Sequence, residues 1–342
     1  MREPNRLYLI DAYNLLYRFF HGMPMMTTSQ GEPTNAILGL TRMVLNIMER
    51  QPEYMVAAFD VHAPTLRKEE FADYKANRKP MPDELRPQIA RAREVFKSLG
   101  VPVVDLAGHE ADDIIGSVAR RATAAGIRVT IVSGDRDSFQ LVSDLVSVMA
   151  PQNGSAEPIL YTPQGVRDYY ANPKRGGYPV EPFLVADLKA LAGDPSDNIP
   201  GVPGIGDKGA ARLVATYGDV EAIIRAIPLI KGSGKKPTAI GLRLEENVEI
   251  LRAAKSLTTI KCDLELDFDL DRDARWSNFE VEGTLGLFDT LQLHSLKGRL
   301  WRVVEGAGTV VVEAKPALAM AAKPATIKPG ATKPDDLQLD LF

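Results

Sequence analysis

The sequence contains almost no cysteine and little histidine, and it lacks any long apolar run. Cys262 is the single cysteine in 342 residues, which excludes an internal disulfide and a thiolate-based metal cluster. A bound metal must therefore use oxygen or histidine ligands, and four histidines stand against 45 acidic residues. The first apolar run, 7–10, stops at Asp11, far short of a signal peptide or a membrane span. We therefore expect a cytoplasmic protein without a membrane partner.

The overall charge is also small. A formal net charge of −4 at pH 7 argues mildly against a general nucleic-acid coat, but a local basic patch can still lie beside an acidic site. The composition is that of an ordinary globular protein, with 45% hydrophobic and 25% charged residues. The length suits one large domain or two modest ones.

The first half of the chain alternates short β-rich apolar runs with longer stretches of helical character. The runs are 7–10, 54–59 and 128–134. This alternation predicts an α/β domain with a mostly parallel central sheet flanked by helices, over residues 1–172. Residues 173–305 are predicted to form a mainly helical subdomain punctuated by glycine. Residues 306–336, rich in Ala, Pro, Lys and Thr, have the composition of a flexible linker.

Acidic residues gather where these strands end. Asp11 and Asp60 come directly at the strand ends and Asp135 comes one glycine later, and ligands of open α/β sheets bind at that edge. The segments GHEADD, SGDRDSF and GDPSDN add six more acids, namely Glu110, Asp112, Asp113, Asp137, Asp194 and Asp197. Carboxylates ~4 Å apart repel by roughly 4 kcal/mol per pair at an effective dielectric of about 20, so they need cations or protons.

An all-oxygen ligand set favours Mg²⁺ or Mn²⁺, and two such ions stabilise the attacking and leaving oxygens of phosphoryl transfer. The alternative is structural: an aspartate after a strand often caps the next helix, acids suit a first helical turn, and GDPSDN is good turn chemistry. Nine acids at this many chain junctions favour the metal site. The sequence thus predicts phosphodiester hydrolysis.

A basic segment follows the second strand. Lys75 and Arg78 are three residues apart and would share one face of a helix, with Arg67, Tyr74 and Lys79 nearby. Cations beside a tyrosine suit single-stranded nucleic acid, through phosphate contacts and base stacking. The alternative is a solvated helix whose charges pair with the acids interleaved among them. Spacing alone leaves both interpretations open.

Four glycines form a tight turn before an Ala-rich helix. They are Gly201, Gly204, Gly206 and Gly209. Backbone N–H groups in such a turn can bind a phosphate without reading sequence, and the Lys208 ammonium would add attraction. The segment lacks the G-K-[ST] of a Walker A loop, and no strand precedes it as in a dinucleotide fingerprint. A plain helix-turn-helix corner is the structural alternative.

These motifs occur in one characteristic order. LYLIDAYNLLYRFFHGMP, YKANR, GHEADD, SGDRDSFQLVSD and GDPSDNIPGVPGIGDKGA together resemble the bacterial 5′-3′ exonuclease domain of DNA polymerase I, within the flap endonuclease family. The match runs from about Leu7 to about Glu305. The resemblance implies a PIN-like 5′-nuclease fold and a metal-dependent, structure-specific nuclease. Its DNA substrates would be 5′ flaps, nicked or branched duplexes and RNA primers on DNA, processed in replication and repair.

The resemblance also implies a role for individual residues, with two Mg²⁺ or Mn²⁺ ions. The first metal group falls on Asp11, Asp60, Glu110 and Asp112, with Asp113 nearby. The second falls on Asp135, Asp137, Asp194 and Asp197. A helical arch over the single strand would span about 64–98 and would place Lys75 and Arg78 as catalytic groups at the scissile phosphate. The glycine turn would be a helix-hairpin-helix element that binds the duplex backbone and a K⁺ ion through its carbonyls.

Two departures from the family pattern stand out. Ala12 follows Asp11 where relatives commonly have glycine, and PKRGGYP at 173–179 is insertion-like. Neither removes an expected ligand. No polymerase region follows within 342 residues, so the chain is either a free-standing nuclease or a trimmed one, and its tail favours the former. We also expect a monomeric bacterial protein associated with the nucleoid.

The last six residues, 337–342, are similar to a bacterial sliding-clamp-binding motif. The motif residues are Gln338, Leu339, Leu341 and Phe342. A glutamine, two leucines and an aromatic residue on a flexible linker would enter an apolar groove on the clamp and raise the local concentration of the enzyme. The alternatives are a chance apolar-acidic end or docking on the parent domain.

Two other functions compete with the nuclease. The first is a non-catalytic protein that binds flaps or junctions and recruits the clamp, which the presence of all nine acids disfavours. The second is an RNA-cleaving relative on the same scaffold, which the duplex-binding turn and the clamp-like tail disfavour.

Overall fold

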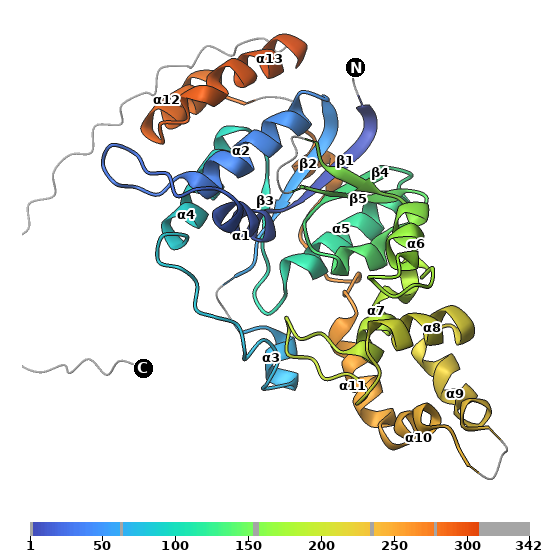
Figure 1. Ribbon diagram of the computed structural model, residues 1–342. Coiled ribbons are helices and arrows are strands. Elements are labelled where there is room, and N and C mark those ends of the chain that lie inside the picture. Colours follow the sequence, from blue (N-terminus) through green and yellow to red (C-terminus); the bar gives the residue numbers. More distant parts are fainter. Residues whose placement is uncertain (1–2, 62–63, 153–156, 233–235, 277–278, 308–342) are drawn as a thin grey trace, which may run out of the picture. The chain divides into compact units, whose positions relative to one another are not determined.

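A computed structural model describes residues 3–61, 64–152, 157–232, 236–276 and 279–307 (Figure 1). The expected clamp-binding residues Gln338, Leu339, Leu341 and Phe342 lie outside the described residues, as does the expected linker from residue 308 onward. No helix in the described ranges is both long enough and apolar enough to cross a membrane.

A six-stranded sheet forms the centre of the fold, in the order β3-β2-β1-β4-β5-β6. The strands are β1 (Glu3–Asp11), β2 (Pro52–Ala58), β3 (Val103–Val104), β4 (Arg128–Val132), β5 (Val146–Ala150) and β6 (Ile159–Tyr161). Neighbouring strands run parallel except β5 and β6, which are antiparallel. The predicted α/β fold with a mostly parallel sheet is confirmed.

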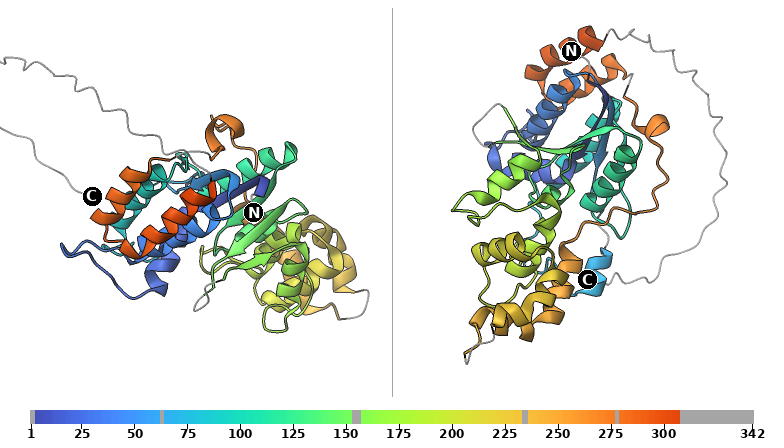
Figure 2. Two further views of the ribbon diagram at one scale, coloured as in Figure 1. Left: turned by 90° about the horizontal axis from the view of Figure 1, so that it is seen from above. Right: turned by 90° about the vertical axis from the view of Figure 1, so that its right-hand side faces the viewer.

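Helices cover both faces of this sheet because its strands are apolar on both sides. Side chains alternate along β1, so that Leu7 and Leu9 join one buried cluster while Tyr8 and Ile10 join the other. The second cluster contains α1 (Ala12–Gly22), α2 (Asn35–Met48) and α4 (Arg86–Ser98), and the first contains α5 (Ala111–Ala124). Figure 2 shows the resulting three layers from two further directions.

The helical subdomain follows a short helix beside the sheet, α6 (Pro163–Ala171). It comprises α7 (Val185–Ala192), α8 (Asp207–Tyr217), α9 (Val220–Lys231), α10 (Ala239–Glu246) and α11 (Val248–Thr258). Buried Asp187 ties three of these helices together, because it accepts the Val220 N–H at 2.9 Å and the Lys255 ammonium at 2.7 Å. The apolar residues of this subdomain belong to the same cluster as α5.

The last two α-helices of the described residues return to the α/β layers, which changes the expected domain boundary. The indole of Trp276 donates to the Leu99 carbonyl at 3.0 Å, and the Thr284 hydroxyl donates to the Ser98 carbonyl at 2.8 Å. The helices α12 (Val281–Thr290) and α13 (Lys297–Ala307) bury Phe288 in the cluster of α1, α2 and α4. The subdomain expected at 173–305 is therefore divided, since its final helices pack with the first domain.

The expected arch at about 64–98 is also divided. Its first part contains α3 (Leu66–Glu70) and a series of turns, whereas α4 packs on α2 and buries Phe96. The part before α4 instead buries Tyr74 in the other core cluster and brings Lys75, Arg78 and Lys79 to the edge of the sheet.

Candidate metal and nucleic-acid site

The carboxyl edge of the sheet holds a cavity of about 370 Å³. Parallel register brings strand ends together here, with Asp11 opposite Ala58 on β2 and Ile10 opposite Val132 on β4. The cavity is lined by acids from four chain segments and by three cations of the basic segment. These residues are Asp11, Asp60, Glu110, Asp112, Asp135, Lys75, Arg78 and Lys79. The strand-end acids that the sequence singled out therefore do meet in one place.

Asp11 and Asp60 are fixed by the starts of two helices. Asp11 caps α1 by accepting the Asn14 N–H at 3.1 Å, and it accepts the Ser133 hydroxyl at 2.8 Å. Asp60 accepts the Ala111 N–H at the start of α5 at 2.8 Å. Burial and the nearby Asp60 carboxylate raise the pKa of Asp11 to about 7, and burial also raises the pKa of Asp60.

Asp112 is the least compensated acid of this group. Its Oδ1 is buried and has no hydrogen-bond partner among the described residues. Burial raises its pKa well above the usual range, and the charges of Asp11, Asp135 and Asp60 raise it further. A buried oxygen without a donor, surrounded by other carboxylates, fits a site built for a cation.

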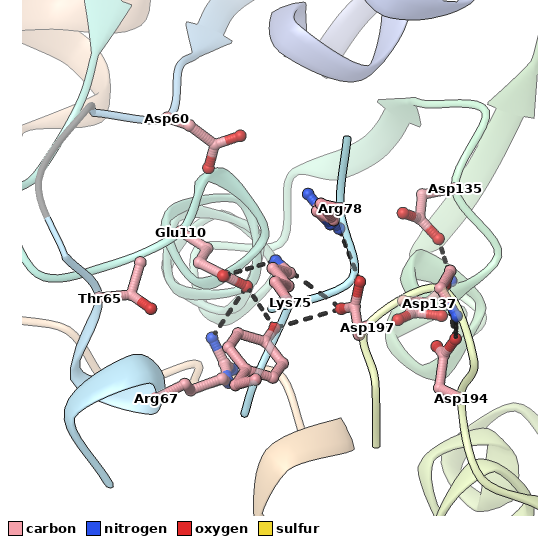
Figure 3. A network of polar contacts seen from close by, with 12 residues as sticks. Asp60, Thr65, Arg67, Lys75, Arg78, Glu110, Asp135, Asp137, Asp194 and Asp197 are labelled. Carbon is pink, nitrogen blue, oxygen red and sulfur yellow. Dashed lines mark hydrogen bonds and ion pairs between the residues drawn. The ribbon is translucent and has the colours of Figure 1, made fainter. Parts of the chain in front are cut away.

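A second group of acids combines Asp137, which follows β4, with Asp194 and Asp197, which follow α7. Oxygens of Asp137, Asp194 and Asp197 lie within 4.8 Å of one another (Figure 3). Lys189 of α7 forms ion pairs with both Asp137 and Asp194, the latter at 2.7 Å. Burial opposes ionisation of Asp194, but Lys189 and hydrogen bonds from Ser196 outweigh it and lower its pKa. Lys189 thus supplies positive charge that compensates the negative charge of Asp137 and Asp194. A divalent ion bound to these acids would do the same.

Asp135 connects the two groups. Its N–H donates to the Ser133 hydroxyl at 3.0 Å, and its carboxylate accepts the Asp137 N–H at 3.0 Å. Burial raises its pKa, while Lys189 acts in the opposite direction. This turn at the end of β4 therefore directs Asp135 toward the cavity and places Asp137 beside Asp194.

Two cations of the basic segment lie among the acids, and Figure 3 shows Lys75 between Glu110 and Asp197 with Arg78 beside Asp197. The Lys75 ammonium lies 2.5 Å from a Glu110 oxygen and 3.7 Å from Asp197, and the Arg78 guanidinium lies 2.6 Å from Asp197. Lys75 has φ 56°, a strained value for a lysine, and its N–H donates to the Asp197 carbonyl at 2.9 Å. Lys75 and Arg78 thus reach the metal-ligand candidates Glu110 and Asp197, and their catalytic role at a scissile phosphate stays a prediction.

Arg67 and Asp113 have a place that the sequence did not predict. Arg67 is 5% exposed and binds both oxygens of Asp113, each at 2.7 Å. It also lies 3.3 Å from Glu110 and donates to the Thr259 carbonyl at 2.9 Å. The expected DNA contact of Arg67 and the expected metal contact of Asp113 both need correction, because the two side chains are buried and occupied by each other.

Tyr74 is placed differently from expectation too. It is 2% exposed, and its hydroxyl donates to Glu110 at 3.0 Å and to Asp197 at 3.2 Å. Burial raises its pKa above the ordinary value, with the Glu110 and Asp197 charges adding to the effect. Its ring offers no open face for a base, so the predicted stacking role is corrected to that of a buried support for Glu110. Lys79 lines the cavity and is exposed.

The glycine turn precedes α8 as expected. A Cβ at Gly201 would clash with the Gly193 nitrogen, and Gly204 has φ +77°, so both positions require glycine. Gly206 caps α8, and Lys208 is exposed in its first turn beside Gly209. Arg243 of α10 donates to the Gly204 carbonyl at 3.4 Å. A K⁺ ion on these carbonyls would compete with that guanidinium, and its presence stays a prediction.

Sequence reasoning missed Lys189 and Ser133. The spacing of Lys189, five residues before Asp194, carries no signal because the α7 helix ends between them at Ala192. Ser133 had a usable signal, since a serine two residues before an aspartate in S-G-D often makes a local side-chain turn. Both residues matter because they position or neutralise acids of the site.

Known protein families match most of the chain. The 5′-3′ exonuclease N-terminal resolvase-like domain matches residues 6–171, and the 5′-3′ exonuclease C-terminal SAM fold matches residues 180–282. DNA polymerase I of Caldicellulosiruptor bescii is 37% identical over 298 residues, covering 86% of this chain and 33% of that protein. DNA polymerase I of Pseudomonas aeruginosa is 39% identical over 271 residues, covering 78% and 28%. The chain spans about a third of the length of such curated relatives.

Solved structures share the fold. A variant of the bacteriophage T5 flap endonuclease, solved as a pseudo-enzyme-product complex with DNA and metal ions, superposes with a TM-score of 0.57 at 21% identity. The match covers 89% of this chain and 100% of the T5 chain. The described part of the chain thus has the same overall fold as this T5 structure.

Proposed function

Because this chain belongs to the 5′-3′ exonuclease family, we propose that it is a structure-specific 5′ nuclease that hydrolyses DNA phosphodiesters at 5′ ends and flaps. The observation that carries the proposal is the meeting of strand-end acids with Lys75 and Arg78 around one cavity of about 370 Å³. Acids alone would repel a phosphodiester, and cations alone would only bind it. A site that combines both suits phosphoryl transfer.

The proposed cofactors are two divalent ions, Mg²⁺ or Mn²⁺. One would be held by Asp11, Asp60 and Asp112 with Glu110 nearby, and the other by Asp137, Asp194 and Asp197 with Asp135 between them. The support is the buried, partnerless Oδ1 of Asp112 among the described residues and the 4.8 Å cluster of Asp137, Asp194 and Asp197. Bound there, such ions would supply Lewis acidity for water attack and for departure of the leaving oxygen.

The protein's own residues have distinct tasks in this proposal. Glu110 and Asp197 hold Lys75 and Arg78 at the cavity until a phosphate competes for the two cations. Their ammonium and guanidinium groups would then bind the non-bridging oxygens of the scissile phosphate and stabilise developing negative charge. Arg67 and Tyr74 keep Glu110 in place by donating hydrogen bonds to its carboxylate.

The substrate would approach from two directions. The part of the basic segment before α4, with Lys79, would guide the single strand, and the turn from Gly201 to Gly209, with Lys208, would hold phosphates of the duplex. The T5 flap endonuclease of similar fold was solved with DNA and metal ions, which supports DNA as the substrate. RNA primers on DNA and a K⁺ ion at the turn belong to the same proposal.

The proposal extends to the partners and the place of action. Gln338, Leu339, Leu341 and Phe342 would bind a bacterial sliding clamp, with the chain acting as a monomer near the nucleoid in the cytoplasm. Co-elution with a purified clamp, abolished by deletion of 338–342, tests the tail. Co-elution that survives the deletion would refute it.

Cleavage of a labelled 5′-flap oligonucleotide tests the function. We expect product with Mg²⁺ and none with a chelator, and we expect Asp135→Ala and Asp137→Ala to lower the rate by at least ~10²-fold, as for loss of a main electrostatic group. Asp144→Ala, at an exposed acid outside the cavity, is the matched control. Unchanged cleavage by both variants would contradict the proposed mechanism. A wild-type chain that binds flaps but does not cleave them would favour the alternative of a non-catalytic flap-binding protein.

A further inference from the structure

Two arginines stack on one tyrosine of α6. The Arg136 guanidinium carbon lies 5.2 Å from the centroid of the Tyr169 ring, and that of Arg175 lies 3.9 Å from it. Tyr169 belongs to α6 and is 7% exposed, whereas both arginines are exposed. Stacking on an aromatic face fixes a guanidinium while leaving its N–H edge free for an anion.

The two guanidinium groups have no counter-ion in the part of the chain that the structure describes. Neither Arg136 nor Arg175 makes a side-chain hydrogen bond or an ion pair with a carboxylate of the described residues. Two cations gathered on one ring repel each other, and the repulsion is relieved when an anion joins them. Exposed arginines that served only to stabilise the fold would be expected to pair with acids, as Arg167 does with Glu181 at 2.9 Å.

Arg175 comes from the insertion-like segment at 173–179, which is held firmly in place. The Arg175 N–H donates to the Asn172 carbonyl at 2.8 Å, and the Lys174 N–H donates to the Asn172 side chain at 2.9 Å. Gly176 has φ +144°, and a Cβ there would lie 3.0 Å from the Ala211 methyl group of α8. The segment therefore joins the end of α6 to the first half of α8, two helices that lie close together in Figures 1 and 2.

The position of these residues links two parts of the proposed site. Arg136 stands in the chain between Asp135 and Asp137, while Arg175 is carried by a turn packed on the helix that begins at the glycine turn. Lys174 and Lys208 are exposed near the same helix and add positive charge. The arrangement is a basic bridge from the duplex-binding turn toward the acids.

We propose that Arg136 and Arg175, stacked on Tyr169, bind a backbone phosphate of the duplex that the glycine turn holds, and so extend the duplex contact toward the cleavage site. The proposal rests on the proposed function, because that function makes the anion a DNA phosphate. Continuity with α8 favours the duplex over the single strand. The 173–179 segment then serves as an added DNA-binding element of this chain.

The salt dependence of DNA binding tests the proposal. Binding to a flapped duplex and to a single strand of the same sequence is measured by fluorescence anisotropy in EDTA, so that no cleavage competes. Each phosphate that a variant no longer binds lowers the slope of log K against log salt by about 0.9 for duplex DNA. We expect Arg175→Ala to lower the duplex slope by about that amount and to leave the single-strand slope unchanged.

Two controls make the result specific. Arg128→Ala removes an exposed arginine at the amino end of β4, away from the carboxyl edge, and should change neither slope. Arg175→Lys keeps the charge and should keep most of the duplex slope. An unchanged duplex slope for Arg175→Ala overturns the proposal, and so does an equal fall on the single strand. Failure of the wild-type chain to cleave flaps would refute the proposed nuclease function. The comparison of salt slopes would still test the phosphate contact, because it measures DNA binding without cleavage.

Discussion

Asp112 and Asp113 are neighbours in the chain but have opposite surroundings. Asp112 has a buried oxygen without a donor among the described residues, whereas both oxygens of Asp113 are bound by Arg67 and one also accepts the Lys261 N–H at 2.9 Å. The Asp112 carboxylate is repelled by the neighbouring acids without a compensating partner among the described residues. The Asp113 carboxylate completes a buried ion pair with Arg67. A site that holds cations at some cost in stability is common in enzymes.

This contrast gives a prediction for two matched variants. In a chelator, Asp112→Asn should raise the free energy of unfolding by about 0.5–2 kcal/mol while abolishing flap cleavage, because it removes a repelled charge. Asp113→Asn should lower the free energy of unfolding by about 3–5 kcal/mol, because it leaves Arg67 buried without its full partner. Urea unfolding followed by circular dichroism measures both. A loss of stability in Asp112→Asn similar to that in Asp113→Asn would contradict the assignment.

The residue-level roles show where sequence reasoning succeeds and stops. The acids at strand ends were predictable, because parallel register places the ends of adjacent strands at one edge. The pairing of Arg67 with Asp113, 46 positions apart, was not predictable, because a buried ion pair depends on packing that neither local sequence records. The same holds for Tyr74, whose ring packs in the core cluster of α5 and whose hydroxyl contacts Glu110 and Asp197, both distant in sequence.

At the scale of elements, the positions of the strands could be predicted from the sequence, but the packing of α12 and α13 could not. Alternating apolar residues identify β1 as a strand with two buried faces, and the glycines before α8 identify its start. The return of α12 and α13 to the first domain depends on hydrogen bonds to residues 99 and 98, which lie 177 and 186 positions before their partners. Composition alone therefore placed these helices with the segment that precedes them in the chain.

The packing of α12 can be tested by one substitution. Phe288→Ala should lower the free energy of unfolding by about 3–5 kcal/mol, because Phe288 is fully buried in the cluster of α1, α2 and α4. Trp301→Ala on α13 is the control, since Trp301 is 45% exposed and its removal should cost much less. Urea unfolding compares them. Equal and small effects would mean that α12 is not part of the α/β core.

At the scale of the whole molecule, two units of sequence meet at one site. The α/β layers supply Asp11, Asp60 and Asp112, and the helical subdomain supplies Asp194 and Asp197. The basic segment is tied to the subdomain through the Asn198 side chain, which donates to the Asp73 carbonyl at 2.7 Å. The cavity itself is lined by the α/β acids and by Ser196 of the subdomain. The proposed cleavage of flaps would use this junction, with the duplex on the side of the subdomain and the single strand on the side of the basic segment.

The most direct test of this account is the location of metal ions. Crystals of the chain soaked in MnCl₂ should give two peaks in an anomalous difference map, one at Asp11, Asp60 and Asp112 and one at Asp137, Asp194 and Asp197. The second peak should be accompanied by displacement of Lys189 from its acids, because the ion takes over their charge. A fully soaked crystal without a peak at either group would contradict the central claim that these carboxylates form a metal site.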